Sequence, residues 1–126
     1  MSRIRDGKSI PSVQEYFPDL HGDLTHLSWA HAVNNQSLLS EAIDNQDVMM
    51  LEADVTLGTL IGHDEILPIM GHPPKNESDL SLKEFIERVI SIQGSKKKGI
   101  KLDFKSTEVF NASLPIIDSL NEQVNT

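Results

Sequence analysis

Segments with the alternating pattern of a β-strand and segments with the spacing of an α-helix follow one another along this chain. The strand-like segments are residues 24–31, 48–57 and 99–104, and a helix-like segment follows each of them. Such repeats place neighbouring strands parallel, because each helix crosses over the sheet before the next strand begins. We therefore expect an α/β fold with a parallel sheet. In this class, binding and catalytic residues gather where strands end and helices begin.

The first two helix-like segments have clear start signals. Asn34 or Asn35 is expected to cap the first helix, whose apolar residues recur at helical spacing: Leu38, Leu39, Ala42 and Ile43. Ser81 and Glu84 form a capping box, in which each residue satisfies a backbone group at the helix start. The second helix is therefore expected to begin directly after Ser81.

Glycine and proline are expected to interrupt the remaining segments. Two glycines end the second strand-like segment, Gly58 and Gly62. Residues 66–70 form a shorter extended segment that ends at the paired prolines of GHPP. In the tail, TEVFNASLPIIDSLNEQ, a break near Ser113 places Pro115 in the first turn of the helix that follows.

Two acids lie on one face of the second strand-like segment, in LEADVTL at 51–57. Glu52 and Asp54 are two residues apart, so their side chains project from the same face, roughly 7 Å apart, and can converge on one cation. The alternative is a solvent-facing strand, which suits an antiparallel hairpin better than a crossover strand covered on both faces. Oxygen ligands in a chain without cysteine suit a hard ion, Mg²⁺ or Ca²⁺.

The third strand-like segment repeats this arrangement in KLDFK. Lys101, Asp103 and Lys105 share one face, because side chains alternate along a strand. A surface strand of mixed charge is the alternative. If Asp103 faces the side of the two acids, it becomes a third ligand. Lys105, nearer the end of the strand, would then hold an anionic oxygen close to the metal.

Histidines are the candidates for proton transfer. His31 and His72 end strand-like segments, where an imidazole can meet a substrate and act as general acid or base. A structural, hydrogen-bonding role is the alternative for each. Trp29 has the same parity as His31, and it either faces the same interior or packs in the core. The other three histidines are expected at the surface: His21, His26 and His63.

Charge and composition narrow the classes of function. The chain of 126 residues has a formal net charge of −8 and a pI near 4.9, which argues against a nucleic-acid surface, since phosphate backbones are bound by clustered Lys and Arg. Residues 96–98 are three lysines, but they lie in a helix-to-strand loop, so we expect a solvated turn. No secretory signal or membrane span is recognisable. A cytoplasmic location is the default expectation, with an extracellular one as the alternative.

Five motifs, in this order, resemble sequences of the menorin family: WAHAVNN at 29–35, LEADV at 51–55, PIMGHPP at 68–74, SDLSLKEF at 78–85 and GIKLDFK at 99–105. That family is similar to the glycerophosphodiester phosphodiesterases and to the phospholipase D enzymes of spider venoms, which are (β/α)8 barrels. A full barrel needs about 250 residues, so the resemblance implies roughly the first three βα units. Residues 1–20 are expected to be an N-terminal lead-in, and 21–126 the N-terminal part of a truncated barrel.

Carried over position by position, the resemblance implies that His31 and His72 are catalytic and that three acids hold one divalent ion, Mg²⁺ or Ca²⁺: Glu52, Asp54 and Asp103. Lys105 matches the position that contacts phosphate in the venom-type enzymes. The glycerophosphodiesterases tend to carry Glu at position 103, so KLDFK is closer to the venom-type pattern. The implied reaction is attack on the phosphorus of a phosphodiester, a small molecule or a lipid head group, in which metal and lysine neutralise charge and histidines move protons.

Two functions from different classes follow from the resemblance. The first is a metal-dependent phosphodiesterase, phospholipase D-like or glycerophosphodiesterase-like, of which this chain would be a fragment or short isoform. The second is a non-catalytic binding or scaffold role with a protein partner, because menorin relatives are associated with neuronal patterning and extracellular recognition complexes. Retention of the histidines and acids favours the enzyme, since a scaffold need not keep costly charges inside. A small complete α/β domain whose acids cap loops is a third alternative.

Overall fold

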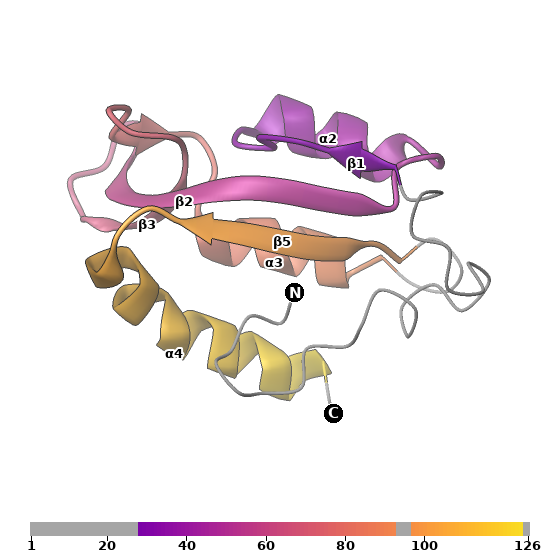
Figure 1. Cartoon of the computed structure of the whole chain (residues 1–126). Coiled ribbons are helices and arrows are strands. Elements are labelled where there is room, and N and C mark those ends of the chain that lie inside the picture. Colours follow the sequence, from indigo (N-terminus) through magenta and orange to yellow (C-terminus); the bar gives the residue numbers. More distant parts are fainter. Residues whose placement is uncertain (1–27, 93–96, 125–126) are drawn as a thin grey trace.

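The computed structural model describes residues 28–92 and 97–124, which form an open, mixed sheet of five strands with three helices (Figure 1). The strands are β1 (Trp29–Ala30), β2 (Met50–Leu60), β3 (Leu67–Met70), β4 (Glu77–Ser78) and β5 (Gly99–Phe104). The helices are α2 (Gln36–Asp44), α3 (Leu82–Ile90) and α4 (Thr107–Val124). The expected α/β class is confirmed.

Strand β2 is the centre of the sheet, because it pairs with each of the other four strands. It is parallel to β1, β4 and β5 and antiparallel to β3. The expected parallel arrangement is therefore correct for β1, β2 and β5, whereas the short extended segment at 66–70 turns back along β2 as β3. Within the described part of the chain, β5 pairs only with β2.

The core lies on one face of the sheet, against the helices. Odd-numbered residues of β2 point to this face, and three of them are completely buried: Leu51, Ala53 and Val55. Helix α3 presents buried apolar residues at helical spacing to the same core: Leu82, Phe85, Ile86 and Val89. Because successive residues of a strand point to opposite faces, the even-numbered acids of β2 project from the other side of the sheet.

Glycine 58 does not end β2, contrary to the expectation from sequence. It lies inside the strand, which continues to a turn where Gly62 adopts a φ of +83°. A Cβ atom on Gly58 would lie 2.3 Å from the carbonyl oxygen of Asn76 and 2.5 Å from Cδ1 of Ile69. Glycine is therefore required at this position because backbone and side-chain atoms approach it closely, and not because the strand ends there.

The helix caps agree with the sequence patterns. The side-chain oxygen of Asn35 accepts a hydrogen bond from the Leu38 amide at 2.8 Å, so the second asparagine of the doublet caps α2. Ser81 caps α3 and accepts from the Glu84 amide at 3.1 Å. Each cap satisfies an amide that has no partner inside its own helix. The cap of α2 leaves the first asparagine, Asn34, free for another role.

Helix α4 is continuous, so the predicted break near Ser113 is wrong. The buried Ser113 hydroxyl donates to the Val109 carbonyl at 2.7 Å, and Pro115 lies in the helix interior. A proline there removes a backbone hydrogen bond and costs about 3 kcal/mol. Packing of one helix face into the core offsets this cost, through Val109, Ile117 and Leu120. Within the described residues, no helix combines the length and the apolar character needed to cross a membrane.

The lysine cluster before β5 is only partly the solvated turn expected from sequence. Lys96 lies outside the described residues, and Lys97 is exposed. Lys98 is buried, and its ammonium donates to the carbonyl oxygens of Asn45 at 2.9 Å and Val48 at 2.6 Å. Burial lowers the pKa of Lys98. The expectation fails for Lys98 because β5 pairs with the start of β2, which brings this lysine against the turn that links α2 to β2.

Candidate functional site

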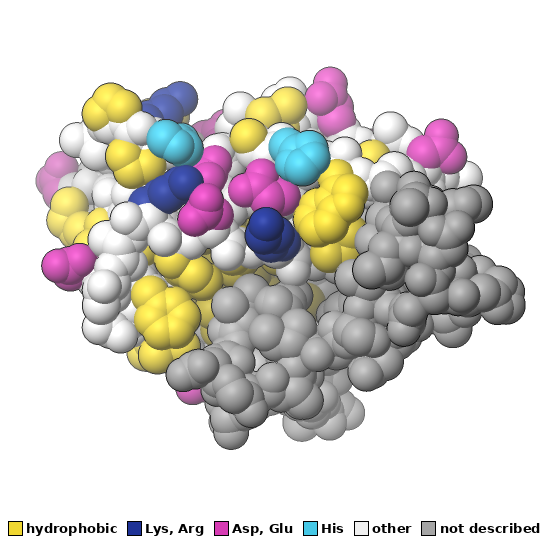
Figure 2. Space-filling view, in the orientation of Figure 1, with side chains coloured by type: hydrophobic (Ala, Val, Ile, Leu, Met, Phe, Trp, Pro, Cys, Tyr) yellow, Lys and Arg dark blue, Asp and Glu magenta, His cyan; other side chains and the backbone are white. Residues whose placement is uncertain are grey.

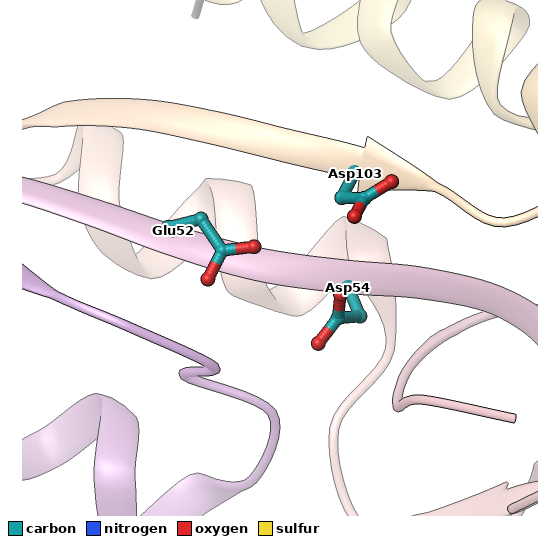
Figure 3. Close-up of side chains that lie close together, drawn as sticks. All are labelled: Glu52, Asp54 and Asp103. Carbon is teal, nitrogen blue, oxygen red and sulfur yellow. The ribbon is translucent and has the colours of Figure 1, made fainter.

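Three carboxylates from two adjacent strands converge on the face of the sheet opposite the apolar core (Figure 3). Glu52 and Asp54 come from β2 and Asp103 from β5, and one oxygen of each lies within 4.8 Å of the others. The strand register explains this arrangement, because β2 and β5 are parallel and Asp54 pairs directly with Asp103. The structure therefore brings together the three acids that the sequence pattern predicts as ligands.

The three acids differ in exposure. The side chains of Glu52 and Asp54 are 17% and 9% exposed, whereas that of Asp103 is 48% exposed. Acidic, basic and histidine side chains gather on this face of the molecule (Figure 2). A carboxylate removed from water is costly unless it accepts hydrogen bonds or pairs with a cation. The partners of Glu52 and Asp54 therefore show how the site is stabilised.

Lys105 lies against two of the acids. Its ammonium is 2.7 Å from Oδ2 of Asp103 and 3.1 Å from Oδ1 of Asp54. Hydrogen bonds to Asp103 and Asp54 raise the pKa of Lys105 above its usual value. Three carboxylates against one ammonium leave the cluster negative, so it still attracts a further cation.

Asp54 is held by an asparagine. Nδ2 of Asn34 donates to Oδ2 of Asp54 at 3.0 Å, and the backbone amide of Asp54 donates to Oδ1 of Asn34 at 2.9 Å. Burial raises the pKa of Asp54, but hydrogen bonds from Asn34 and Lys105, with the charges of Lys105 and His72, outweigh burial and lower the pKa below its ordinary value. Asp54 is therefore ionised at neutral pH.

Glu52 is held by the loop that follows β1. The amide of Ala32 donates to Oε1 of Glu52 at 2.8 Å, and the amide of Val33 donates to the Glu52 carbonyl at 2.9 Å. Ala32 has a φ of +53°, which an alanine rarely adopts. This left-handed residue turns the chain so that its amide points at the Glu52 carboxylate. Nδ1 of His31 lies 3.9 Å from the same oxygen.

The two predicted catalytic histidines are accessible to solvent and lie near the acids. The side chain of His31 is 73% exposed and stacks on Trp29, with ring centroids 5.9 Å apart. Trp29 is therefore a partly exposed neighbour of His31 and not a core residue. His72 is exposed, its Nδ1 lies 2.7 Å from the Pro73 carbonyl, and its charge acts on Asp54.

The other histidines do not join this cluster in the described part of the chain. His63 is exposed in the turn region between β2 and β3, as expected for a surface residue. His21 and His26 lie outside the described residues, and so do residues 24–27 of the predicted first strand. His31 and His72, which lie near Glu52 and Asp54, remain the candidates for proton transfer.

The acidic cluster fits a hard divalent cation. Mg²⁺ holds oxygens at about 2.1 Å, so opposing ligands lie about 4.2 Å apart, whereas Ca²⁺ at about 2.5 Å allows about 5 Å. The three carboxylate oxygens lie within 4.8 Å of one another, a separation within the reach of one Ca²⁺, whereas Mg²⁺ would need them closer together. The donor set of oxygens alone is the one that these ions prefer.

Two residues of this site were missed by sequence reasoning, Asn34 and Ala32. The sequence predicts a helix cap at Asn34 or Asn35, yet one asparagine is enough to cap α2 and the doublet contains two. That surplus is the only signal in the sequence. The role of Ala32 has no sequence signal, because glycine is the usual residue where φ is positive.

Comparisons with known proteins identify the family of this chain. The chain matches the family model of the Menorin N-terminal domain over residues 23–126. It is 35% identical over 102 residues to "Protein FAM151B" of Homo sapiens; the match covers 81% of this chain and 35% of the relative. The chain thus spans well under half of that protein's length. No solved structure matches the chain. This chain belongs to the menorin family.

Proposed function

We propose that this chain carries the metal-binding and catalytic residues of a phosphodiesterase, a phosphoric diester hydrolase or lyase that acts on a small phosphodiester or a lipid head group. The observation that carries the proposal is the convergence of three carboxylates within 4.8 Å beside the Lys105 ammonium. Such a site suits a phosphodiester, because the nonbridging oxygens are negative and gain charge during displacement at phosphorus.

The site would belong to a partial (β/α)8 barrel. Its first three units would be β1–α2, β2–α3 and β5–α4, with β3 and β4 inserted between β2 and α3. The parallel pairing of β1 and β5 with β2 supports this arrangement. The positions of His31 and Lys105 directly after strands also support it, since barrel enzymes place catalytic groups there. A protein of the length of FAM151B, of which this chain spans 35%, has room for the other units.

In this proposal, three acids hold one divalent cation, Mg²⁺ or Ca²⁺: Glu52, Asp54 and Asp103. When bound, the cation supplies Lewis-acid stabilisation of the charge on the phosphodiester oxygens. Lys105 contacts two of these acids in this structure and would turn its ammonium to a substrate oxygen once they are neutralised. Its flexible stem of four carbons permits that movement.

His31 and His72 would move the protons. In hydrolysis, a water oxygen forms the new bond to phosphorus while one imidazole accepts the water proton. The other imidazole donates a proton to the leaving oxygen as the ester bond breaks. In the lyase reaction, a hydroxyl of the substrate replaces water and the product is a cyclic phosphodiester. Two observations support these roles. Both histidines are exposed, and each lies near one of the acids: Nδ1 of His31 is 3.9 Å from Oε1 of Glu52, and His72 is among the groups that lower the pKa of Asp54.

Calorimetric titration of Mg²⁺ and of Ca²⁺ into the 126-residue chain tests the metal site. Glu52→Gln/Asp54→Asn should abolish saturable binding. Asp64→Asn/Glu65→Gln is the matched control, because it also removes two neighbouring acids, from an exposed turn. Circular dichroism establishes that each chain is folded. Equal binding by wild type and Glu52→Gln/Asp54→Asn, or no binding by the folded wild type, would contradict the proposed site.

The catalytic roles need a separate test. Hydrolysis of bis(4-nitrophenyl) phosphate, followed with saturating cation, should be lost in His31→Ala, although cation binding is kept. His63→Ala is the control, because His63 is exposed outside the cluster. Full activity of His31→Ala would show that the acid/base assignment is wrong. Cation binding without any turnover by the wild type would instead favour the alternative, a non-catalytic binding or scaffold role.

A further inference from the structure

We propose that Asn34 is a positioning residue, which holds the Asp54 carboxylate in the orientation that cation binding requires. This inference rests on the proposed function, because it assigns a role toward the same cation. Two hydrogen bonds join the residues: Asn34 Nδ2 to Asp54 Oδ2 at 3.0 Å, and the Asp54 amide to Asn34 Oδ1 at 2.9 Å. Both polar atoms of the asparagine side chain are thus engaged by one residue.

This pair leaves the two oxygens of Asp54 with different partners. Oδ2 faces Asn34, and Oδ1 faces Lys105 at 3.1 Å, on the side where Asp103 also contacts that lysine. A carboxylate on a single-bonded side chain can otherwise rotate about its last torsion. By fixing Oδ2, Asn34 directs Oδ1 toward the other acids. Outer hydrogen bonds of this kind orient the ligands of a metal site.

Asn34 is itself held in place from three sides. Its backbone carbonyl accepts a hydrogen bond from Oγ of Ser78, a buried residue of β4, at 3.3 Å. The residue before it, Val33, is buried and donates its amide to the Glu52 carbonyl at 2.9 Å. The residue after it, Asn35, caps α2. The backbone position of Asn34 is therefore fixed by contacts that involve no cation, and from this position its side chain bonds Asp54.

The neighbouring asparagine provides a matched control. Asn34 and Asn35 have the same side chain, lie in the same loop and line the same open groove beside β4. Asn35 accepts a hydrogen bond from the Leu38 amide of its own helix, and among the residues that the structure describes no hydrogen bond joins its side chain to an acid of the cluster. A purely structural role of the loop predicts similar effects at both positions. A positioning role predicts an effect on cation affinity at Asn34 alone.

The experiment measures the affinity of the 126-residue chain for Mg²⁺ and Ca²⁺ by calorimetry, with thermal melts in EDTA. Asn34→Ala and the milder Asn34→Ser should weaken binding about 10-fold to 100-fold, the usual loss when an outer hydrogen bond of a metal site is removed. Asn35→Ala should lower the melting temperature and leave the affinity within about twofold, because it removes only a helix cap. Wild-type affinity in the Asn34 variants, or an equal loss in Asn35→Ala, would overturn the proposal.

A measurement without cation keeps the test decisive if the Asn34 variants do not fold. The side-chain amide protons of Asn34 should exchange with solvent more slowly than those of Asn35, and this protection should be lost in Asp54→Ala. Unprotected Asn34 protons in the wild type would overturn the positioning role. If the wild type binds no cation, the proposed function fails and this role toward a cation fails with it. If it binds and the Asn34 variants bind equally, the positioning role alone fails.

Discussion

The Lys105 ammonium joins carboxylates from two strands, at 3.1 Å from Asp54 Oδ1 on β2 and 2.7 Å from Asp103 Oδ2 on β5. The lysine follows β5 directly, and its backbone amide donates to the Val55 carbonyl at 3.0 Å. Both its backbone and its side chain are therefore tied to the central pair of strands. Its ammonium balances part of the negative charge of the cluster and would compete with the proposed divalent cation for the same oxygens.

This competition predicts the effect of replacing Lys105 by methionine. We expect Lys105→Met to bind Mg²⁺ or Ca²⁺ several-fold more tightly, because a charge that repels the incoming cation is removed. In EDTA its melting temperature should be lower, since Asp54 and Asp103 then repel without a counter-charge. Calorimetry and thermal melts measure the two effects. Lys83→Met, at an exposed position of α3, should change neither; weaker cation binding by Lys105→Met would contradict the competition.

The depressed pKa of Asp54 predicts an acid-dependent loss of stability. Burial raises this pKa, but hydrogen bonds from Asn34 and Lys105 and nearby positive charges lower it below 3.8. A carboxyl with a depressed pKa in the folded state stabilises that state only when ionised, so its contribution is present above pH 3.8 and is lost as the pH falls toward the folded-state value.

The corresponding measurement compares denaturant unfolding of wild type and Asp54→Asn in EDTA. The difference in their free energy of unfolding should be constant from about pH 7 to about pH 5 and should shrink in more acid solution. Asp64→Asn, in the exposed turn after β2, should keep the wild-type pH profile. A difference between wild type and Asp54→Asn that grows as the pH falls would show that the sign is wrong.

Alanine substitutions at Gly58 and at Gly71 are predicted to differ in their effect on the free energy of unfolding. A Cβ on Gly58 would meet the Asn76 carbonyl oxygen at 2.3 Å, whereas a Cβ on Gly71 would meet only Thr56 Cγ2 at 4.0 Å. Gly58→Ala should therefore lower the free energy of unfolding by about 1–3 kcal/mol, the usual cost of overpacking. Gly71→Ala should have little effect. Urea melts of both variants measure this difference, and equal stabilities would refute the steric explanation.

Replacing Ala32 by glycine is predicted not to destabilise the protein. Its φ of +53° is unfavourable for any residue with a Cβ. Ala32→Gly should be neutral or raise the free energy of unfolding by up to about 1 kcal/mol, whereas the branched Ala32→Val should lower it by at least about 1 kcal/mol. Ala112→Gly in α4 is the control of opposite sign, because glycine costs about 1 kcal/mol inside a helix. Denaturant melts in which Ala32→Gly and Ala112→Gly are equally destabilised would contradict the prediction.

Local patterns predicted the elements that carry the acids. The alternation in residues 51–57 placed Glu52 and Asp54 on one face and four apolar residues on the other, because side-chain parity is a property of any extended chain. The predicted strand at 99–104 has the same bounds as β5. The Ser81 cap was also predicted, because a cap depends on residues only a few positions apart.

Predictions failed where distant residues meet. A glycine at position 58 predicts the end of a strand, yet the residue that requires glycine there, Asn76, lies in a different segment. The break near Ser113 is absent because packing of α4 on the core outweighs the local preference of Pro115. Lys98 is buried because β5 pairs with the start of β2. This pairing brings Lys98 to Asn45, which lies far from it in the sequence, so the residues next to Lys98 give no sign of it.

The sequence by itself determined which residues could share a face: parity along an extended chain placed Glu52 with Asp54, and Asp103 with Lys105. Only the tertiary structure decided that these two faces are the same surface, because the register that pairs Asp54 with Asp103 depends on the packing of whole strands and helices. It also decided the partners of the acids, since the hydrogen bonds from Asn34 and Ala32 bridge 20 positions of the chain. Hydrogen bonds of such range form only when the fold brings their groups within about 3 Å.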